Sequence, residues 1–257
     1  TNPQRESFES VVLEKQFKQA LVKLNPTLPE SALTEAYQKV INLGTQDVME
    51  NNERFHTMLT NGVPVEYAKA EGVKGVNVQL VDFEKASKNE FWVVNQLVIK
   101  ENNIEKRLDV VIYINGLPLV VVELKNATDE KATVRKAFTQ IQNYKKAVPS
   151  IFYYNAMCII SDGIDAKTSS LSAPFTRFLS WKAPKESNNL SINIKNTLPL
   201  AAEPTIEYDK TELQILTEQM LQKEVLLKLM RYCTVFESEE KKNADTGLIS
   251  IVKIKKV

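Results

Sequence analysis

Residues 107–126, RLDVVIYINGLPLVVVELKN, carry the strongest structural pattern in the sequence. Two apolar runs flank an Asn-Gly dipeptide at 115–116, which predicts a tight β-hairpin. Both runs are apolar at nearly every position, as is typical of strands buried on both faces of a sheet. Three charged side chains interrupt them: Asp109, Glu123 and Lys125. Because a buried charge is costly unless it is paired or bound to a metal, these three predict an ion pair or a metal site.

The register of the hairpin decides whether the three charges meet. Side chains alternate along a strand, so Glu123 and Lys125 share one face. A strict two-residue loop would place Asp109 opposite Val122 and facing away from Glu123. An irregularity of one residue corrects this, so we predict either a three-residue loop or a β-bulge. The three-residue loop would set Asp109 opposite Val121 and diagonal to Glu123.

Two carboxylates beside a lysine suit the metal-assisted hydrolysis of a phosphodiester. Mg²⁺ prefers oxygen ligands, and Asp109, Glu123 and the backbone carbonyl of Leu124 would supply three. Lys125 would orient or help to deprotonate the attacking water and would stabilise the anionic transition state. The alternative, which spacing alone leaves open, is a structural ion pair of Lys125 with either carboxylate.

The segment after the hairpin, residues 129–147, has the periodicity of an amphipathic helix. Gln140 and Tyr144 are four residues apart and therefore share one helix face. The segment is also basic, through Lys131, Arg135, Lys136, Lys145 and Lys146. Beside two carboxylates, such a helix would contact DNA phosphates. The alternative is a solvated basic face with Tyr144 in the core.

The rest of the chain divides into a helical region at 1–62, an α/β core at 63–182, and a connector with further helices at 183–257. Helices are predicted near 8–24, 28–43 and 46–59, and again within 211–236. Strands are predicted at 76–83, 91–100, 108–114, 117–124 and 153–160. Residues 237–242 predict a charged turn and the last ten residues a strand.

Bulk composition excludes several classes of protein. Hydrophobic residues make up 43% and charged residues 25% of the 257, which is ordinary for a globular chain. Because the net charge is only +1, DNA, if it binds, would have to bind a local basic patch on an otherwise balanced surface. The single histidine, His56, excludes histidine-based triads and zinc sites. Two cysteines outside any CxxC pair and the lack of a bilayer-length apolar run predict a cytoplasmic protein with no membrane association.

The segments LDVVIYINGLPLVVVELKN and AFTQIQNYKKAVPSIFYYNAMCIISDG resemble the N-terminal nuclease region of type I restriction enzyme R subunits. The upstream stretches ALVKLNPTLPESALTEA, NGVPVEYAKAEGVKGVNVQLVDF and NEFWVVNQLVIKENN are similar to the same family. The resemblance covers roughly residues 10–240. It implies a restriction-endonuclease-like α/β fold of the PD-(D/E)xK type, in which helices flank a mixed sheet.

This resemblance also implies roles for residues. Asp109, Glu123 and Lys125 match the three positions of the motif, although leucine precedes the aspartate where the motif name has proline. Gln140 and Tyr144 match a QxxxY element that lies near DNA in a subset of these nucleases. An acidic residue of the first helix often completes such sites, and Glu14 is the candidate; the alternative is a plain surface glutamate.

The family implies an Mg²⁺-dependent endonuclease that acts on double-stranded DNA. It works with methyltransferase and specificity subunits and with ATP-driven translocation in the full enzyme. The chain has no GxxxxGK[ST] phosphate loop, so we expect ATP to serve only motor domains that follow it. Two alternatives stand beside this interpretation: a non-catalytic DNA-binding or subunit-docking module of the same fold, and another enzyme of the nuclease fold.

Overall fold

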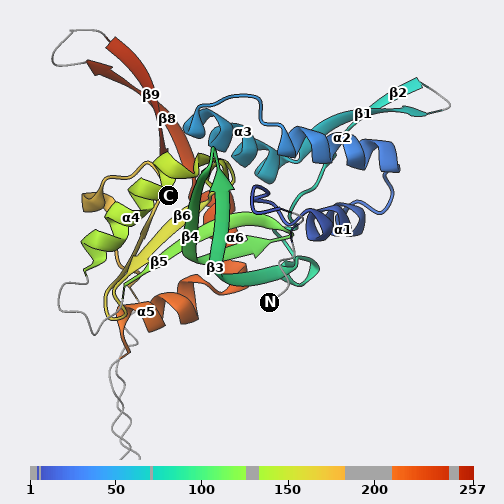
Figure 1. Cartoon of the computed structure of the whole chain (residues 1–257). Coiled ribbons are helices and arrows are strands. Elements are labelled where there is room, and N and C mark those ends of the chain that lie inside the picture. The colour runs from blue at the N-terminus through green and yellow to red at the C-terminus, as the bar shows by residue number, and fades with distance from the viewer. Residues whose placement is uncertain (1–4, 6, 70–71, 126–132, 183–209, 243–248) are drawn as a thin grey trace, which may run out of the picture.

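The computed structural model describes residues 5, 7–69, 72–125, 133–182, 210–242 and 249–257. Its centre is a five-stranded mixed sheet in the order β3-β4-β5-β6-β7, with helices packed around it (Figure 1). The α/β fold class predicted from the sequence is confirmed. Among the described residues, no helix is both long and apolar enough to cross a membrane.

The helices are α1 (Glu14–Leu24), α2 (Glu30–Ile41), α3 (Val48–Asn61), α4 (Val134–Ala147), α5 (Glu212–Ile215) and α6 (Lys223–Tyr232). Short 3₁₀ turns cover Ala86–Lys88, Pro149–Tyr153 and Phe175–Arg177, and Leu216–Met220 is π-helical. The central strands are β3 (Phe91–Glu101), β4 (Ile104–Ile114), β5 (Leu117–Leu124), β6 (Met157–Ser161) and β7 (Ala166–Ser169). Two separate ribbons are formed by β1 (Val63–Lys69) with β2 (Gly72–Val78) and by β8 (Val235–Lys242) with β9 (Ile249–Lys256).

The predicted hairpin is β4–β5, and its turn is a two-residue one. Asn115 and Gly116 both have positive φ, 53° and 80°, as a type I′ turn requires. The side chain of Asn115 is buried and donates to the carbonyl of Leu80 at 2.9 Å, which suits asparagine to this strained position. The predicted three-residue loop is therefore wrong.

The predicted β-bulge is confirmed, and it lies inside the hairpin. The register shifts between Ile112, which pairs with Val120, and Tyr113, which pairs with Pro118. One extra residue of β5, Leu119, absorbs the shift. Below the bulge Val110 pairs with Val122, so the next position sets Asp109 directly opposite Glu123 rather than opposite Val121.

The N-terminal helices dock on the turn end of this hairpin. The backbone N–H of Leu13 donates to the carbonyl of Gly116 at 2.9 Å, and the Tyr113 hydroxyl donates to the carbonyl of Val11 at 3.1 Å. Phe17 of α1 is fully buried in the same apolar core as the hairpin. Helix α3 begins at an Asp47 cap and ends at Asn61, close to its predicted bounds. The predicted helices of this region are confirmed, with α1 starting later than expected.

Several strand predictions were wrong at least in part. Residues 79–83 lie outside β2, which pairs instead with the unpredicted strand β1. Residues 237–242, predicted to be a turn, belong to β8, which pairs with β9 along its whole length, and Glu237 forms an ion pair with Lys256. The predicted strand at 153–160 begins only at Met157. The start of the predicted helix at 129–132 and most of the connector, 183–209, lie outside the described residues.

Candidate active site

Asp109 and Glu123 stand opposite each other on the neighbouring strands β4 and β5. The half-buried Asp109 carboxylate is held by two donors. Its Oδ2 accepts from the backbone N–H of Leu124 at 2.9 Å, and its Oδ1 accepts from the side-chain amide of Gln96 at 3.3 Å. The hairpin and the neighbouring strand β3 therefore together fix the position and the rotation of this carboxylate.

Glu123 is almost completely buried, with 1% of its surface exposed. Its Oε1 accepts from Lys125 Nζ at 2.5 Å, whereas its Oε2 is buried and has no hydrogen-bond partner among the described residues. Burial raises the pKa of Glu123 to about 6; the Lys125 hydrogen bond and the nearby Tyr144 hydroxyl oppose this shift, and the negative charge of Asp109 adds to it. Such an unsatisfied carboxylate oxygen is costly in a metal-free protein.

Lys125 follows the last residue of β5, and its backbone is still tied to the sheet. Its N–H donates to the carbonyl of Ser161 at 2.8 Å, so the pairing with β6 extends one residue beyond β5. Its side chain is 28% exposed, which leaves the ammonium group accessible from solvent. The ion pair that the sequence left open is thus present, but it satisfies only one of the two Glu123 oxygens.

Helix α4 covers this part of the sheet and brings Tyr144 to the two carboxylates. The Tyr144 ring is buried, and its hydroxyl donates to the carbonyl of Arg107 at 2.8 Å. Its pKa is raised, first by burial and then by the negative charges of Glu123 and Asp109, while the Gln140 side chain lowers it by a hydrogen bond. The Tyr144 ring therefore lies in the core and its hydroxyl lies near the two carboxylates, while its contact with DNA stays a prediction.

The basic side chains of α4 are only partly free to meet DNA. Arg135 stacks over the ring of Phe175 at 4.1 Å, and Lys145 donates to the carbonyl of Leu171. Lys136 and Lys146 are exposed. The remaining basic residue of the predicted set, Lys131, lies outside the described residues.

Glu14 is not brought to the site. It is an exposed residue at the start of α1 and pairs with Lys18 at 2.5 Å. Helix α1 docks at the turn end of the hairpin, whereas Asp109 lies five residues down β4 from Ile114, about 17 Å along the strand. The prediction that Glu14 completes the site as a third acidic residue is therefore wrong, and the alternative of a surface glutamate is confirmed.

The oxygen atoms of Asp109, Glu123 and the Leu124 carbonyl nevertheless suit a divalent cation. Within the described ranges, no three His, Cys, Asp or Glu side chains gather to hold a metal, so the predicted ligand set stays at two carboxylates and the Leu124 carbonyl. These are hard oxygen donors of the kind Mg²⁺ takes while keeping several waters. The observation that favours a cation is the buried Oε2 of Glu123. It accepts no hydrogen bond from the described residues, whereas buried carboxylate oxygens normally do.

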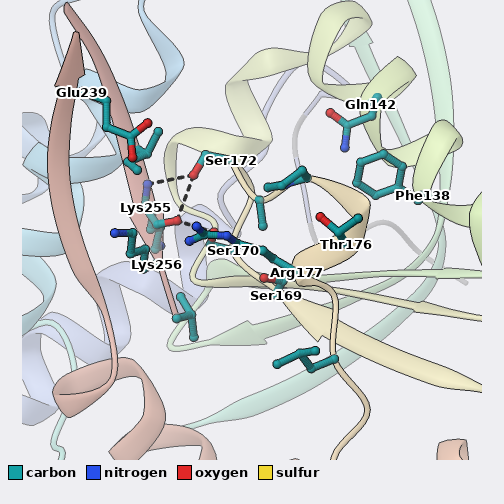
Figure 2. Close-up of a pocket in the computed structure, with 15 residues that line it drawn as sticks. Phe138, Gln142, Ser169, Ser170, Ser172, Thr176, Arg177, Glu239, Lys255 and Lys256 are labelled. Atoms are coloured by element: carbon teal, nitrogen blue, oxygen red, sulfur yellow. Dashed lines mark hydrogen bonds between the residues drawn. The ribbon is translucent and has the colours of Figure 1, made fainter. Parts of the chain in front are cut away.

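A separate pocket of about 620 Å³ lies between α4, the 169–179 loop and β9, and none of the predicted site residues lines it. Figure 2 shows Lys255 beside Ser172 in this pocket. The Lys255 backbone N–H donates to Ser172 Oγ at 2.7 Å, and its buried ammonium group donates to Asn52 Oδ1 at 3.0 Å and to the Asn155 carbonyl at 2.7 Å. Burial lowers the pKa of Lys255 to about 7, with the nearby Cys158 opposing the shift.

Because the pKa of Lys255 is lowered, we expect the free energy of unfolding of the chain to rise with pH. An unfolded lysine keeps its proton up to about pH 10.5, so above pH 7 the unfolded state binds more protons and the free energy of unfolding increases. We expect a gain of about 2 kcal/mol between pH 7 and 9 in urea unfolding. Cys158, with a pKa raised to about 11 by burial, begins to act in the opposite direction as the pH approaches 9, where an unfolded thiol loses its proton, and this reduces the gain slightly. Folded His56, with a pKa lowered to about 4 by burial and then by Lys255, stays neutral in this window.

The variant Lys255→Met tests this expectation, because it removes the titrating group and keeps the apolar stem. Its unfolding free energy should be flat between pH 7 and 9. A slope equal to that of the unchanged chain would show that another group is responsible.

Comparisons with known proteins show the family of this chain. Residues 1–177 match the family described as type I restriction enzyme R protein N terminus. The chain is 39% identical over 236 residues, 91% of its length, to the type I restriction enzyme HindI endonuclease subunit of Haemophilus influenzae, and 31% identical over 202 residues, 76% of its length, to a provisionally named MjaIXP endonuclease subunit of Methanocaldococcus jannaschii. It spans 21% and 19% of those two relatives. The chain belongs to the type I restriction enzyme R protein N-terminal family.

Proposed function

We propose that this chain is the endonuclease module of a type I restriction enzyme and hydrolyses phosphodiester bonds of double-stranded DNA with the help of Mg²⁺. One observation carries the proposal. A fully buried carboxylate, Glu123, keeps one oxygen without a hydrogen bond from any described residue, beside Asp109 and Lys125 at the C-terminal end of the central strand β5 and next to a basic helix.

The residues divide the chemistry among them. Asp109, Glu123 and the carbonyl of Leu124 would hold the cation. When bound, Mg²⁺ supplies the positive charge that activates a water and offsets charge developing on the phosphate. Lys125, tied to the sheet by its backbone and partly exposed at its side chain, orients the attacking water and stabilises the anionic transition state.

Helix α4 would position the DNA beside the two carboxylates. Gln140 lies one turn from Tyr144, whose buried hydroxyl keeps the helix at a fixed distance from the carboxylates through its bond to Arg107. The exposed lysines of α4, Lys136 and Lys146, would add positive charge that attracts DNA phosphates. This arrangement contacts the DNA backbone and carries no sequence preference.

The activity of the whole enzyme extends beyond this chain, which spans about a fifth of the HindI relative. ATP-driven translocation would reside in the remaining part of such a subunit, and methyltransferase and specificity subunits would supply recognition. We therefore propose that the module acts in the cytoplasm, where cellular DNA is found, and cuts only once it is coupled to these partners.

The deciding experiment compares DNA cleavage by the assembled enzyme with and without Lys125→Ala. We expect cleavage to fall by at least about 100-fold, because an electrostatic stabiliser of the transition state is removed, while ATP-driven translocation is retained. Lys228→Ala, which changes an exposed lysine of α6, is the matched control and should cleave normally. Unchanged cleavage by Lys125→Ala would refute the proposal and favour a non-catalytic DNA-binding or docking module.

A further inference from the structure

Strand β3 is irregular at one residue, Gln96, and this residue faces the proposed site. Its φ is +51°, in the left-handed region that residues other than glycine seldom occupy. The other described non-glycine residues with positive φ are all asparagines, at positions 102, 103 and 115, and asparagine tolerates this conformation unusually well. Glutamine does not, so the backbone at Gln96 stores strain.

The strained residue lies opposite Asp109. Asn95 pairs with Val110 and Leu97 pairs with Leu108, so the position across from Gln96 is the proposed metal ligand itself. The pairing is interrupted only there. Strained backbone that persists in an otherwise regular strand is concentrated at functional sites, where the surrounding structure maintains it.

The contact made by Gln96 explains what the strain achieves. Its side-chain amide donates to Asp109 Oδ1 at 3.3 Å, while the Leu124 N–H holds Asp109 Oδ2 at 2.9 Å. With a donor on each oxygen, the carboxylate cannot rotate freely about its Cβ–Cγ bond. Each oxygen still keeps a lone pair for a cation.

A packing role does not account for this residue. Gln96 is exposed, so its side chain fills no core space. Glycine or asparagine at this position would relieve the backbone strain. Glycine has no side-chain amide, however, and the asparagine amide is one methylene too short to reach Asp109. The side chain is therefore the feature that offsets the unfavourable backbone.

We propose that Gln96 is a positioning residue that fixes the orientation of the Asp109 carboxylate for the divalent cation. The inference rests on the proposed function, because it assigns a role toward the same cation. Groups that hydrogen-bond metal ligands set the ligand orientation, and their loss weakens metal affinity by about 10-fold or more.

The test is Gln96→Gly in the assembled enzyme, measured by Mn²⁺ binding in electron paramagnetic resonance titrations and by the Mg²⁺ concentration that gives half-maximal DNA cleavage. Glycine accepts the positive φ and lacks the amide, so the fold should keep or gain thermal stability while Mn²⁺ binds about 10-fold more weakly. Gln96→Asn, which suits the backbone but is one methylene short, should show the same loss of affinity. Val93→Gly, at a 70% exposed position of the same strand, controls for introducing glycine and should bind Mn²⁺ normally.

Normal Mn²⁺ affinity in Gln96→Gly would overturn the role of Gln96. Asp109→Asn separates this failure from failure of the proposed function. If Asp109→Asn abolishes Mn²⁺ binding and cleavage while Gln96→Gly changes neither, the cation site stands and only the positioning role is lost. If Asp109→Asn also leaves binding and cleavage intact, the proposed site itself is wrong.

Discussion

Replacing Glu123 with glutamine is expected to abolish DNA cleavage and, in the absence of metal, to stabilise the chain. The carboxylate is 1% exposed, and one of its oxygens has no partner among the described residues, so its charge is costly to keep in the folded state. Glutamine has nearly the same shape and no charge. It can still accept from Lys125 through its amide oxygen, but it is a much poorer ligand for a hard cation.

Two measurements on the same variant separate function from stability. Cleavage by the assembled enzyme should fall by at least about 1,000-fold, which corresponds to about 4 kcal/mol of activation free energy. The free energy of unfolding of the chain in EDTA should rise by about 1 kcal/mol. Adding Mg²⁺ should stabilise the unchanged chain by mass action and leave Glu123→Gln unaffected.

A matched control distinguishes this behaviour from that of an ordinary ion pair. Glu237 pairs with Lys256 at the surface, with 45% and 39% of the two side chains exposed. Exposed pairs contribute little, so Glu237→Gln should leave both cleavage and stability nearly unchanged. A loss of stability in EDTA for Glu123→Gln would mean that Glu123 and Lys125 form a structural pair, and normal cleavage by the same variant would contradict a metal site.

Local patterns explain why the site could be predicted from the sequence. The Asn-Gly turn and the two apolar runs define the hairpin without reference to the rest of the chain, and the charges in those runs stand out because they are rare in buried strands. The need for an irregularity followed from the alternation of side chains alone. Its place did not, because every residue near Leu119 is apolar and no polar residue marks the shift.

Features that depend on distant contacts could not be predicted in the same way. Gln96 stands in an ordinary strand sequence, and only the pairing of β3 with β4 shows that it reaches Asp109. Glu14 was a reasonable candidate on the first helix, but the docking of α1 at the turn end of the hairpin is a tertiary fact. The acidic strand β8 was predicted to be a turn, because its basic partner β9 lies beyond residues 243–248 in the sequence.

Gly116→Ala is expected to destabilise the chain severely, because two independent costs meet at this residue. Its φ of +80° is unfavourable for alanine. In addition, a Cβ atom there would lie 2.6 Å from the Leu13 carbonyl oxygen and 2.7 Å from the Phe17 nitrogen, both backbone atoms at the start of α1. Since backbone cannot swing aside as a flexible side chain does, the helix would have to move away from the hairpin.

That movement would disrupt the anchor of the N-terminal region. It would break the 2.9 Å hydrogen bond from Leu13 to Gly116 and loosen the packing of Phe17, which is fully buried. Adding the backbone strain, the lost hydrogen bond and the disturbed packing, we expect the free energy of unfolding to fall by at least about 3 kcal/mol in urea titrations. Cleavage should fall with it, because the same hairpin holds Asp109 and Glu123.

Two other glycines provide controls that separate the costs. Gly72 has a φ of +124° but nothing within 4 Å of an added Cβ, so Gly72→Ala should cost only the backbone strain, about 1 kcal/mol. Gly75 has neither a positive φ nor a close neighbour, and Gly75→Ala should change stability by less than about 0.5 kcal/mol. If Gly116→Ala cost no more than Gly72→Ala, helix α1 would have to yield freely at the hairpin, and its docking could not be what holds the turn end of the site in place.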